Sequence, residues 1–180
     1  MKVILVLSGL AGSGKDSAAE ILVDEMSFER VAFADMLKAE VSAVTKIPLE
    51  TFHNNAFKDH YMEKYASTAR QLLLNYAAER KLKDPDVYSR TVVEHIRQGA
   101  RQRYVVSDWR YRHEYTFLKE ALHGEYILIR GRIMRTSVLP REDPSEHDLD
   151  NENMDFVIVN DGSISDLRDA IKSEVRKYIL

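Results

Sequence analysis

Short, strongly apolar runs recur along the chain and are separated by longer stretches of mixed character. Residues 3–7, 104–107 and 156–159 are nearly continuous apolar or β-branched runs. Such runs are typical of strands that helices cover on both faces. The pattern predicts five strands, near residues 2–8, 30–34, 103–108, 125–130 and 155–160.

The longer stretches between these runs carry apolar residues at helical spacing. They predict helices near residues 14–26, 35–45, 56–79 (broken), 86–100, 112–123 and 164–179. The last of these opens with Ser163 and Asp166, which resemble a capping box, after a turn at 160–162. Alternating strands and helices imply right-handed crossovers, so we expect an α/β fold with a mainly parallel sheet.

Two stretches interrupt this alternation. Residues 36–100 give helix after helix without a strand, and residues 131–151 are polar and irregular, with Pro140 and Pro144. Both follow the carboxyl ends of predicted strands, where α/β folds bind their ligands. We therefore expect a helical insertion and a lid that reach over one site on a single domain.

Composition narrows the classes of function. The chain has 180 residues, of which 44% are hydrophobic and 31% charged, as in a globular domain. It has no cysteine, which excludes disulfides and thiolate chemistry. The net charge of −3 argues against nonspecific nucleic-acid binding.

No apolar run approaches the ~20 residues of a membrane helix. A secretory signal could be read into Lys2 and the apolar stretch up to Ala11, but Lys15 and Asp16 end that stretch early. We therefore expect a cytoplasmic protein.

Residues 9–17 read Gly-Leu-Ala-Gly-Ser-Gly-Lys-Asp-Ser and directly follow the first predicted strand. Glycines allow backbone amides to curl around an anion, the following helix adds its positive end, and the lysine adds a mobile charge. This segment predicts a nucleotide-binding phosphate loop. The alternative is a surface turn that contains three glycines and a lysine by chance.

The loop departs from the usual pattern at one position. Gly9, Gly14 and Lys15 fit Gly-x4-Gly-Lys, but Asp16 stands where a serine or threonine normally binds magnesium, and Ser17 comes one residue later. The sequence leaves open how magnesium is bound.

Phosphoryl transfer depends on positioning, on magnesium and on positive charge around the transferred group. Asp108 and Arg110 follow a predicted buried strand and are candidates for magnesium and phosphate binding. Their alternative roles are a helix cap for Asp108 and a surface ion pair with Glu114 for Arg110.

Candidates for binding a second anion lie in and before the helical insertion. Asp35 and Lys38 follow the second strand, although they could equally be a helix cap and an exposed lysine. Arg70 lies near a predicted helix start, where a cation opposes the helix dipole, so either an anionic ligand or a nearby acid should compensate it.

Four arginines flank or enter the irregular stretch: Arg130, Arg132, Arg135 and Arg141. Arginines on a lid can close on a triphosphate and neutralise charge in the transition state. The alternative is a solvated basic loop that nearby acidic residues balance.

Together these segments resemble the deoxynucleoside monophosphate kinases of the phage type, within the nucleoside monophosphate kinase group. The resemblance runs through nearly the whole chain. It is carried by Ser8-Gly9 with Ser13-Gly-Lys-Asp-Ser17, Phe33-Ala-Asp35 with Lys38, Thr68-Ala-Arg70-Gln-Leu-Leu, Ser107-Asp108-Trp-Arg110 with Glu114, Pro144-Ser-Glu146 and Asn160-Asp-Gly162. Ala69 replaces the usual proline, and Leu74 and Asn75 replace a segment that commonly contains glutamine, which leaves base selectivity open.

The resemblance implies a three-layer phosphate-loop kinase fold with a five-stranded sheet, an acceptor-binding insertion at about 36–100 and a lid at about 131–151. It implies a kinase that uses ATP and magnesium to phosphorylate a (deoxy)nucleoside monophosphate. We expect no stable nucleic-acid partner and no membrane partner, while a homodimer is conceivable.

The expected residues fall into four groups. Catalysis is assigned to Lys15, Arg110, Arg130 and Arg135; ATP binding to Ala11, Gly12, Ser13, Gly14, Lys15, Asp16, Ser17, Asn160 and Gly162; acceptor binding to Asp35, Lys38, Arg70, Asp108 and Arg110; and magnesium to Ser17, Asp16 and Asp108. The rival hypotheses are a kinase of dephospho-coenzyme A or phosphomevalonate on the same fold, a nucleotide-binding switch that hydrolyses ATP slowly, and a binding module with a degenerate loop.

Overall fold

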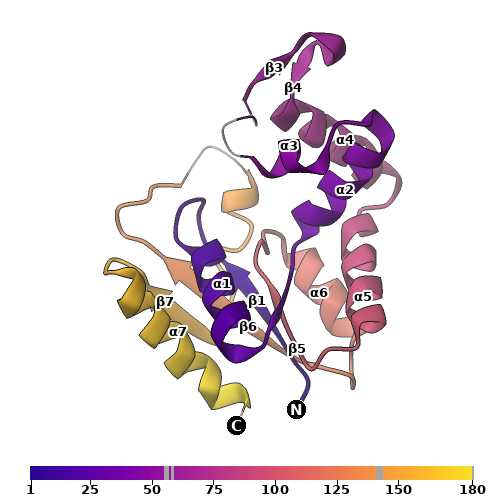
Figure 1. Cartoon of the computed structure of the whole chain (residues 1–180). Coiled ribbons are helices and arrows are strands. Elements are labelled where there is room, and N and C mark those ends of the chain that lie inside the picture. The colour runs from indigo at the N-terminus through magenta and orange to yellow at the C-terminus, as the bar shows by residue number, and fades with distance from the viewer. Residues whose placement is uncertain (55–56, 58, 141–143, 180) are drawn as a thin grey trace. The chain divides into compact units, whose positions relative to one another are not determined.

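The chain folds into two units, each with its own hydrophobic core (Figure 1). The structure is a computed structural model that describes residues 1–54, 57, 59–140 and 144–179. The first unit comprises Met1–Ala32 and Val93–Leu180, and the second comprises Phe33–Val92.

A five-stranded sheet forms the centre of the first unit. Its strands are β1 (Val3–Ser8), β2 (Glu29–Val31), β5 (Arg103–Val106), β6 (Ile127–Met134) and β7 (Phe156–Val159). They are arranged in the order β2-β5-β1-β6-β7, and every neighbouring pair is parallel. The predicted α/β fold with a parallel sheet is therefore confirmed, and the five expected strands are all present.

Helices cover both faces of this sheet, as right-handed crossovers require. From β1, α1 (Lys15–Met26) leads to β2 on one side, whereas α6 (Arg112–Ala121) leads from β5 back across β1 to β6. These crossovers run in opposite directions and therefore place α1 and α6 on opposite faces. The carboxyl-terminal helix α7 (Ile164–Ile179) packs beside α1.

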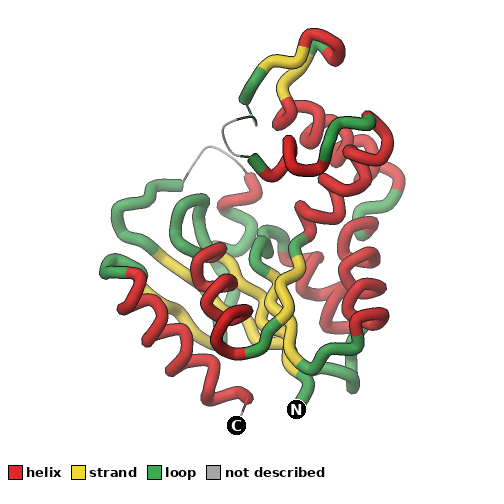
Figure 2. The backbone as a smooth tube through the Cα atoms, in the orientation of Figure 1, coloured by secondary structure: helices red, strands yellow, loops and turns green. Residues whose placement is uncertain are grey.

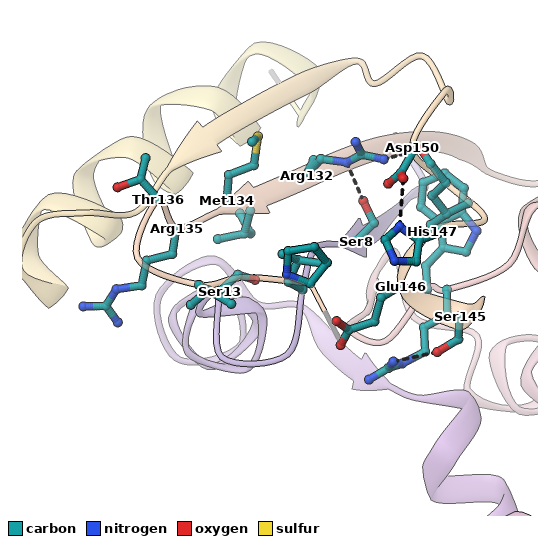
Figure 3. Close-up of a pocket in the computed structure, with 18 residues that line it drawn as sticks. Ser8, Ser13, Arg132, Met134, Arg135, Thr136, Ser145, Glu146, His147 and Asp150 are labelled. Carbon is teal, nitrogen blue, oxygen red and sulfur yellow. Dashed lines mark hydrogen bonds and ion pairs between the residues drawn. The ribbon is translucent and has the colours of Figure 1, made fainter. Parts of the chain in front are cut away.

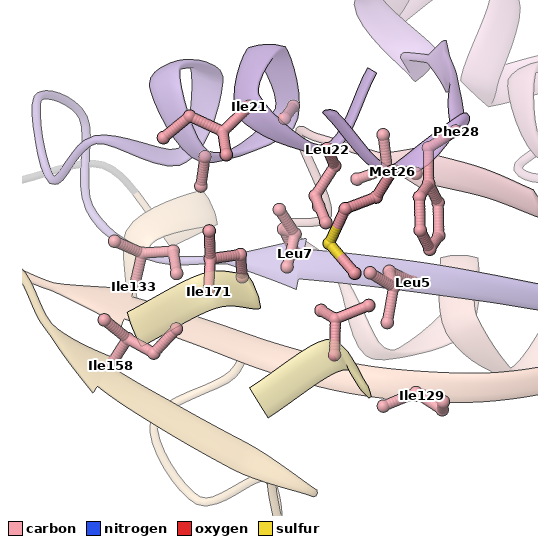
Figure 4. Close-up of a cluster of buried hydrophobic side chains, with 14 of the residues drawn as sticks. Leu5, Leu7, Ile21, Leu22, Met26, Phe28, Ile129, Ile133, Ile158 and Ile171 are labelled. Atoms are coloured by element: carbon pink, nitrogen blue, oxygen red, sulfur yellow. The ribbon is translucent and has the colours of Figure 1, made fainter. Parts of the chain in front are cut away.

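The core of the first unit lies between the sheet and the pair α1 and α7 (Figure 4). Alternate residues of β1, including Leu5 and Leu7, face Leu22 of α1 and Ile171 of α7, and all four side chains are buried. This packing fixes the end of β1 relative to the start of α1. The loops after β1, β6 and β7 consequently gather at one edge of the sheet (Figure 2).

The second unit is mainly helical. It contains α2 (Phe33–Thr45), α3 (Leu49–His53), α4 (Ala69–Lys83) and the first residues of α5 (Val87–Gly99), which crosses the boundary between the units. Val41, Ile47, Phe52 and Ala69 form its buried core.

The expectation of a broken helix over 56–79 is wrong for its first half. The described residues there form a short antiparallel hairpin, β3 (Tyr61–Met62) and β4 (Ser67–Thr68), around the single 3-10 turn η1 (Glu63–Tyr65). Ala66 has a left-handed backbone, with φ of 46°, which a continuing helix does not allow. The helix α4 starts only at Ala69, where Thr68 Oγ1 accepts a hydrogen bond from the backbone N–H of Gln71 at 3.1 Å.

The strand β6 extends further than expected and shortens the irregular stretch. It continues through Arg130 and Arg132 to Met134 because Ile129, Gly131 and Ile133 occupy the alternate positions and pair with neighbouring strands. The expectation that Arg130 and Arg132 belong to the lid is therefore wrong. Within the described residues, the irregular segment runs from Arg135 to Pro140 and resumes at the 3-10 turn η2 (Pro144–Glu146).

In the described part of the chain, no helix combines the length and apolar character needed to span a membrane.

Candidate functional site

The segment between β1 and α1 forms a tight loop at the carboxyl edge of the sheet. Gly9 lies so close to β6 that a Cβ atom there would be 2.1 Å from the carbonyl oxygen of Ile133. Gly14 has a φ of 102°, and a Cβ atom there would be 2.3 Å from Nδ2 of Asn160. Both positions therefore need glycine, and the glycines of the motif have structural roles beyond flexibility.

Lys15 begins α1 and folds back under this loop. Its Nζ donates hydrogen bonds to the carbonyl oxygens of Gly9 at 2.7 Å and of Leu10 at 2.8 Å. Only 8% of the residue is exposed. The cation is thus fixed at the positive end of α1, where an anion bound to the loop amides would find it.

Burial lowers the pKa of Lys15 below its usual value, and the nearby charge of Arg110 adds to this effect. Three carboxylates raise the pKa in opposition, in decreasing order Asp16, Glu146 and Asp108. The site therefore combines a buried cation with carboxylates close enough to influence it, which is suited to handling an anion together with a divalent metal.

Asn160, at the end of β7, supports the loop from the neighbouring turn. Its Nδ2 donates a buried hydrogen bond of 2.9 Å to the carbonyl oxygen of Ser13, and its own N–H donates to the carbonyl of Met134 at 2.7 Å. The amide side chain thereby orients the peptide that links Ser13 to Gly14. The resemblance assigns Asn160 to ATP binding, and in this structure its side chain binds the backbone of the phosphate loop.

A cavity of about 360 Å³, the smaller cavity, opens beside the loop and the start of α1. It brings together many of the residues expected to bind ATP: Gly12, Gly14, Lys15, Asp16, Ser17, Asn160 and Gly162, with Arg135, Ile164 and Leu167. Its lining thus combines phosphate-loop residues with the apolar side chains of Ile164 and Leu167 from α7.

Arg135 follows β6 at the margin of this cavity. The neighbouring Thr136 is fixed by two hydrogen bonds to Asp161, one from its N–H and one from its Oγ1, both 2.8 Å. Arg135 lines both this cavity and the larger cavity described next, and Figure 3 shows its guanidinium extending outward from the larger one. The assignment of Arg135 to catalysis stays a prediction.

A larger cavity of about 450 Å³ lies on the other side of the loop, beneath the segment after β6 (Figure 3). Ser8, Gly9, Ser13, Trp109 and Arg110 contribute to its lining. The Oγ of Ser13 is fully buried and makes no hydrogen bond within the described residues. An unsatisfied buried hydroxyl in a phosphate loop is a polar group for which a ligand or water would supply a partner.

Asp108 and Arg110 follow β5, and Arg110 lines the larger cavity. Asp108 is not among the lining residues of either cavity, but its charge acts on Lys15. Nη1 of Arg110 donates to Ser145 Oγ at 3.0 Å, while its backbone N–H and that of Tyr111 both donate to Glu114 Oε2 at 3.0 Å. Glu114 thus caps the start of α6.

The expected magnesium ligands are oxygen donors, which magnesium prefers. Ser17 and Asp16 both line the smaller cavity. The Asp16 side chain is 78% exposed and lies 3.9 Å from Arg30, so this ion pair is loose. No cluster of three or more acidic or histidine side chains that could enclose a metal occurs in the described residues. Magnesium usually binds through one or two carboxylates together with substrate phosphates and water, and this donor set fits that pattern.

Arg130 does not line either cavity. Its guanidinium pairs with Asp155 at 3.3 Å and lies over the ring of Tyr115, 5.2 Å from the ring centre. Arg132 lines the larger cavity but donates to the carbonyl of Leu149 and to Ser8 Oγ. Arg141 lies outside the described residues.

The expected acceptor-binding residues Asp35, Lys38 and Arg70 all belong to the second unit. Lys38 Nζ donates to Asp35 Oδ1 at 2.8 Å. Arg70 forms a bidentate ion pair with Asp59, at 2.7 and 3.1 Å, which raises the pKa of the guanidinium. Asp59 is therefore the nearby acid that compensates the position of Arg70 at a helix start.

One contact at the phosphate loop has no signal in the sequence. The backbone N–H of Ala11 donates to Oε1 of Glu146 at 3.3 Å, across 135 residues of chain. The segment Pro144-Ser-Glu146 belongs to the family resemblance, but the sequence predicts no contact between Glu146 and the phosphate loop.

Comparisons with known proteins agree with this arrangement. No known protein-family profile matches the chain. The chain is 27% identical over 188 residues to a protein of Acanthamoeba polyphaga mimivirus described as "Putative deoxynucleotide monophosphate kinase", and the alignment covers 95% of each. The predicted resemblance to deoxynucleoside monophosphate kinases is therefore confirmed.

Solved structures establish the fold. Dephospho-CoA kinase from Campylobacter jejuni superposes with a TM-score of 0.52 at 14% identity, covering 98% of this chain and 97% of that one. The Mycobacterium tuberculosis APS kinase in complex with AMPPNP and APS superposes with a TM-score of 0.51 at 11% identity, covering 97% and 98%. At these identities the likeness concerns the fold alone, which is the fold of phosphate-loop kinases.

Proposed function

We propose that this protein transfers the γ-phosphoryl group of ATP to a (deoxy)nucleoside monophosphate, with ADP and a (deoxy)nucleoside diphosphate as products. The main structural support is the phosphate loop, in which a buried Lys15 lies at the positive end of α1 beside the smaller cavity. The acceptor class rests on the sequence resemblance and on the mimivirus relative.

ATP would bind with its phosphates at the amides of residues 11–17 and its base toward Asn160 and Gly162, in the smaller cavity. Magnesium, held by Ser17, Asp16 and Asp108 together with phosphate oxygens, would neutralise charge on the phosphates. Lys15 supplies the cation closest to the loop and follows the transferred group.

In the transfer itself, an acceptor phosphate oxygen forms a bond to the γ-phosphorus as the bond from that phosphorus to the β-bridging oxygen breaks. ADP leaves with the electron pair of the broken bond. The acceptor oxygen is already ionised at neutral pH, so no general base is needed. We assign the balance of the developing charge to Arg110 and Arg135, because they line the cavities, and not to Arg130, which pairs with Asp155.

Acceptor binding is assigned to Asp35, Lys38 and Arg70 of the second unit, together with Asp108 and Arg110. In this proposal Arg70 exchanges its ion pair with Asp59 for the acceptor phosphate, which offers the same bidentate geometry. The insertion and the segment after β6 act as acceptor-binding and lid regions. A cytoplasmic location and a homodimer stay predictions.

The test is incubation of the protein with Mg-ATP and a panel of nucleoside and deoxynucleoside monophosphates, with chromatography of the products. A diphosphate should form with at least one acceptor. Lys15→Ala should abolish its formation, and Lys119→Ala, which removes an exposed lysine of α6, should leave it unchanged. Activity with dephospho-coenzyme A and with no nucleotide would indicate a different acceptor. A rate of ADP formation that does not depend on any added acceptor would indicate an ATPase.

A further inference from the structure

The phosphate loop already holds an anion that belongs to the protein. Glu146, the last residue of η2, accepts a hydrogen bond from the N–H of Ala11 at 3.3 Å. Figure 3 shows its carboxylate extended beside the loop at the edge of the larger cavity. The amide that it occupies belongs to the set expected to receive phosphate oxygens.

The backbone on both sides of Glu146 is fixed. Ser145 accepts a hydrogen bond from Arg110 Nη1 at 3.0 Å. Asp148 accepts one from the N–H of Arg112 at 2.7 Å, and its carbonyl accepts one from Arg112 Nε at 2.8 Å. The following residue, Leu149, is buried. These contacts hold the segment that carries Glu146 close to the loop.

The charge of Glu146 also acts on Lys15. Burial of the ammonium group lowers its pKa, and the Glu146 carboxylate is one of the groups that raise it. In the absence of a ligand, Glu146 therefore satisfies one loop amide and compensates part of the buried positive charge. A polyphosphate makes the same two contributions.

We propose that Glu146 is an internal anion that competes with polyphosphate for the phosphate loop and thereby sets the affinity of this site for ATP and ADP. This inference rests on the proposed use of the loop for nucleotide phosphates. Binding of the triphosphate needs the N–H of Ala11 and meets repulsion from a carboxylate at hydrogen-bonding distance. Glu146 must withdraw before the nucleotide is fully bound, and the energy of its contact reduces the observed affinity.

The size of the effect follows from the kind of contact. A hydrogen bond to a charged group typically changes an equilibrium constant by about 10- to 100-fold. The hydrogen bond between Ala11 and Glu146 is long, at 3.3 Å, which favours the lower value. Removing the charge should therefore tighten binding about tenfold. Glu146→Gln removes the charge at constant size, and Glu146→Ala removes the side chain.

The experiment is isothermal titration calorimetry of the full chain with Mg-ATP and, separately, with inorganic tripolyphosphate. The matched control is Glu120→Gln, which removes the same charge from an exposed position on α6 that lines neither cavity. Thermal unfolding of each variant confirms that it is folded. We expect about tenfold lower Kd values for both Glu146 variants and an unchanged Kd for the control.

Unchanged or weaker binding by the Glu146 variants would overturn the inference, and weaker binding would instead make Glu146 a contributor to nucleotide binding, for example through magnesium. The proposed function is judged separately, by the acceptor panel. Tighter binding of both ligands without any diphosphate product would support the role of Glu146 and reject the kinase proposal.

Discussion

The contact between Gly14 and Asn160 allows a quantitative prediction about the phosphate loop. In Gly14→Ala, the added Cβ would lie 2.3 Å from Asn160 Nδ2, so Asn160 must move and its 2.9 Å hydrogen bond to Ser13 is lost. The alanine must also adopt a φ of 102°. The variant therefore combines a backbone strain with the loss of a buried hydrogen bond.

The two contributions can be separated by a second substitution. Backbone strain at such a φ costs about 1–3 kcal/mol, and the loss of the buried hydrogen bond about 1 kcal/mol. Asn160→Ala alone removes the hydrogen bond but keeps glycine at position 14, so it introduces no backbone strain. In the double variant the hydrogen bond is lost only once and the clash with Nδ2 is absent. We expect the double variant to be more stable than the sum of the single effects, by about 1 kcal/mol.

Urea unfolding followed by tryptophan fluorescence provides the assay, because Trp109 is the only tryptophan and is buried in the first unit, which contains the loop. The single variants, the double variant and the wild type form a double-mutant cycle. Strict additivity, within about 0.4 kcal/mol, would show that Asn160 and Gly14 do not depend on each other and would refute this description of the loop.

Three further predictions concern charged residues. Lys15→Met should lower kcat by at least about 100-fold. The pKa of Lys15 is lower in the folded state than in the unfolded chain, so the free energy of unfolding of the wild type should rise relative to that of the variant as pH increases toward 10.5. Parallel pH profiles of the two proteins would contradict this. Arg130→Ala should destabilise the fold by about 1 kcal/mol, because packing and an ion pair are lost, and should change kcat little. Arg135→Ala should instead lower kcat or raise the KM for ATP. Equal kinetic defects of the two variants in steady-state assays would indicate that Arg130 also takes part in catalysis. Arg70→Lys should raise the KM for the acceptor about tenfold without changing the KM for ATP, because lysine cannot replace a bidentate contact, and a shared defect in both KM values would place Arg70 outside the acceptor site.

Much of the fold follows from local pattern. Continuous apolar runs predict the parallel strands, and the strand, glycines and helix at residues 3–26 predict the phosphate loop. The predictions of secondary structure that were wrong also concern local features. Residues 56–79 have helix-forming composition, but Ala66 adopts a left-handed backbone and the chain turns back into a hairpin before α4. Arg130 and Arg132 suggest the end of a strand, although β6 continues with their side chains on the face opposite its core residues.

The candidate site is predictable only as far as chemistry follows from neighbouring residues. Lys15, the loop glycines and the oxygen donors after β5 are recognisable because their spacing is short. Contacts that shape the loop join distant parts of the chain, such as Asn160 with Ser13 across 147 residues and Glu146 with Ala11 across 135. A single sequence contains no record of such pairs, since many acidic or amide side chains could satisfy the same hydrogen-bond donor.

These long-range contacts have a common electrostatic reason. A phosphate loop must hold a buried cation and a set of inward-facing amides before its ligand arrives, and both are unfavourable without an anion. In this protein the carbonyls of Gly9 and Leu10 accept hydrogen bonds from the ammonium group of Lys15, while Glu146 supplies a negative charge beside the loop. In the role proposed for Glu146, this carboxylate has to withdraw from the loop when ATP binds. The same proposal implies a limit on the affinity for ADP, the product that the proposed kinase has to release after each transfer.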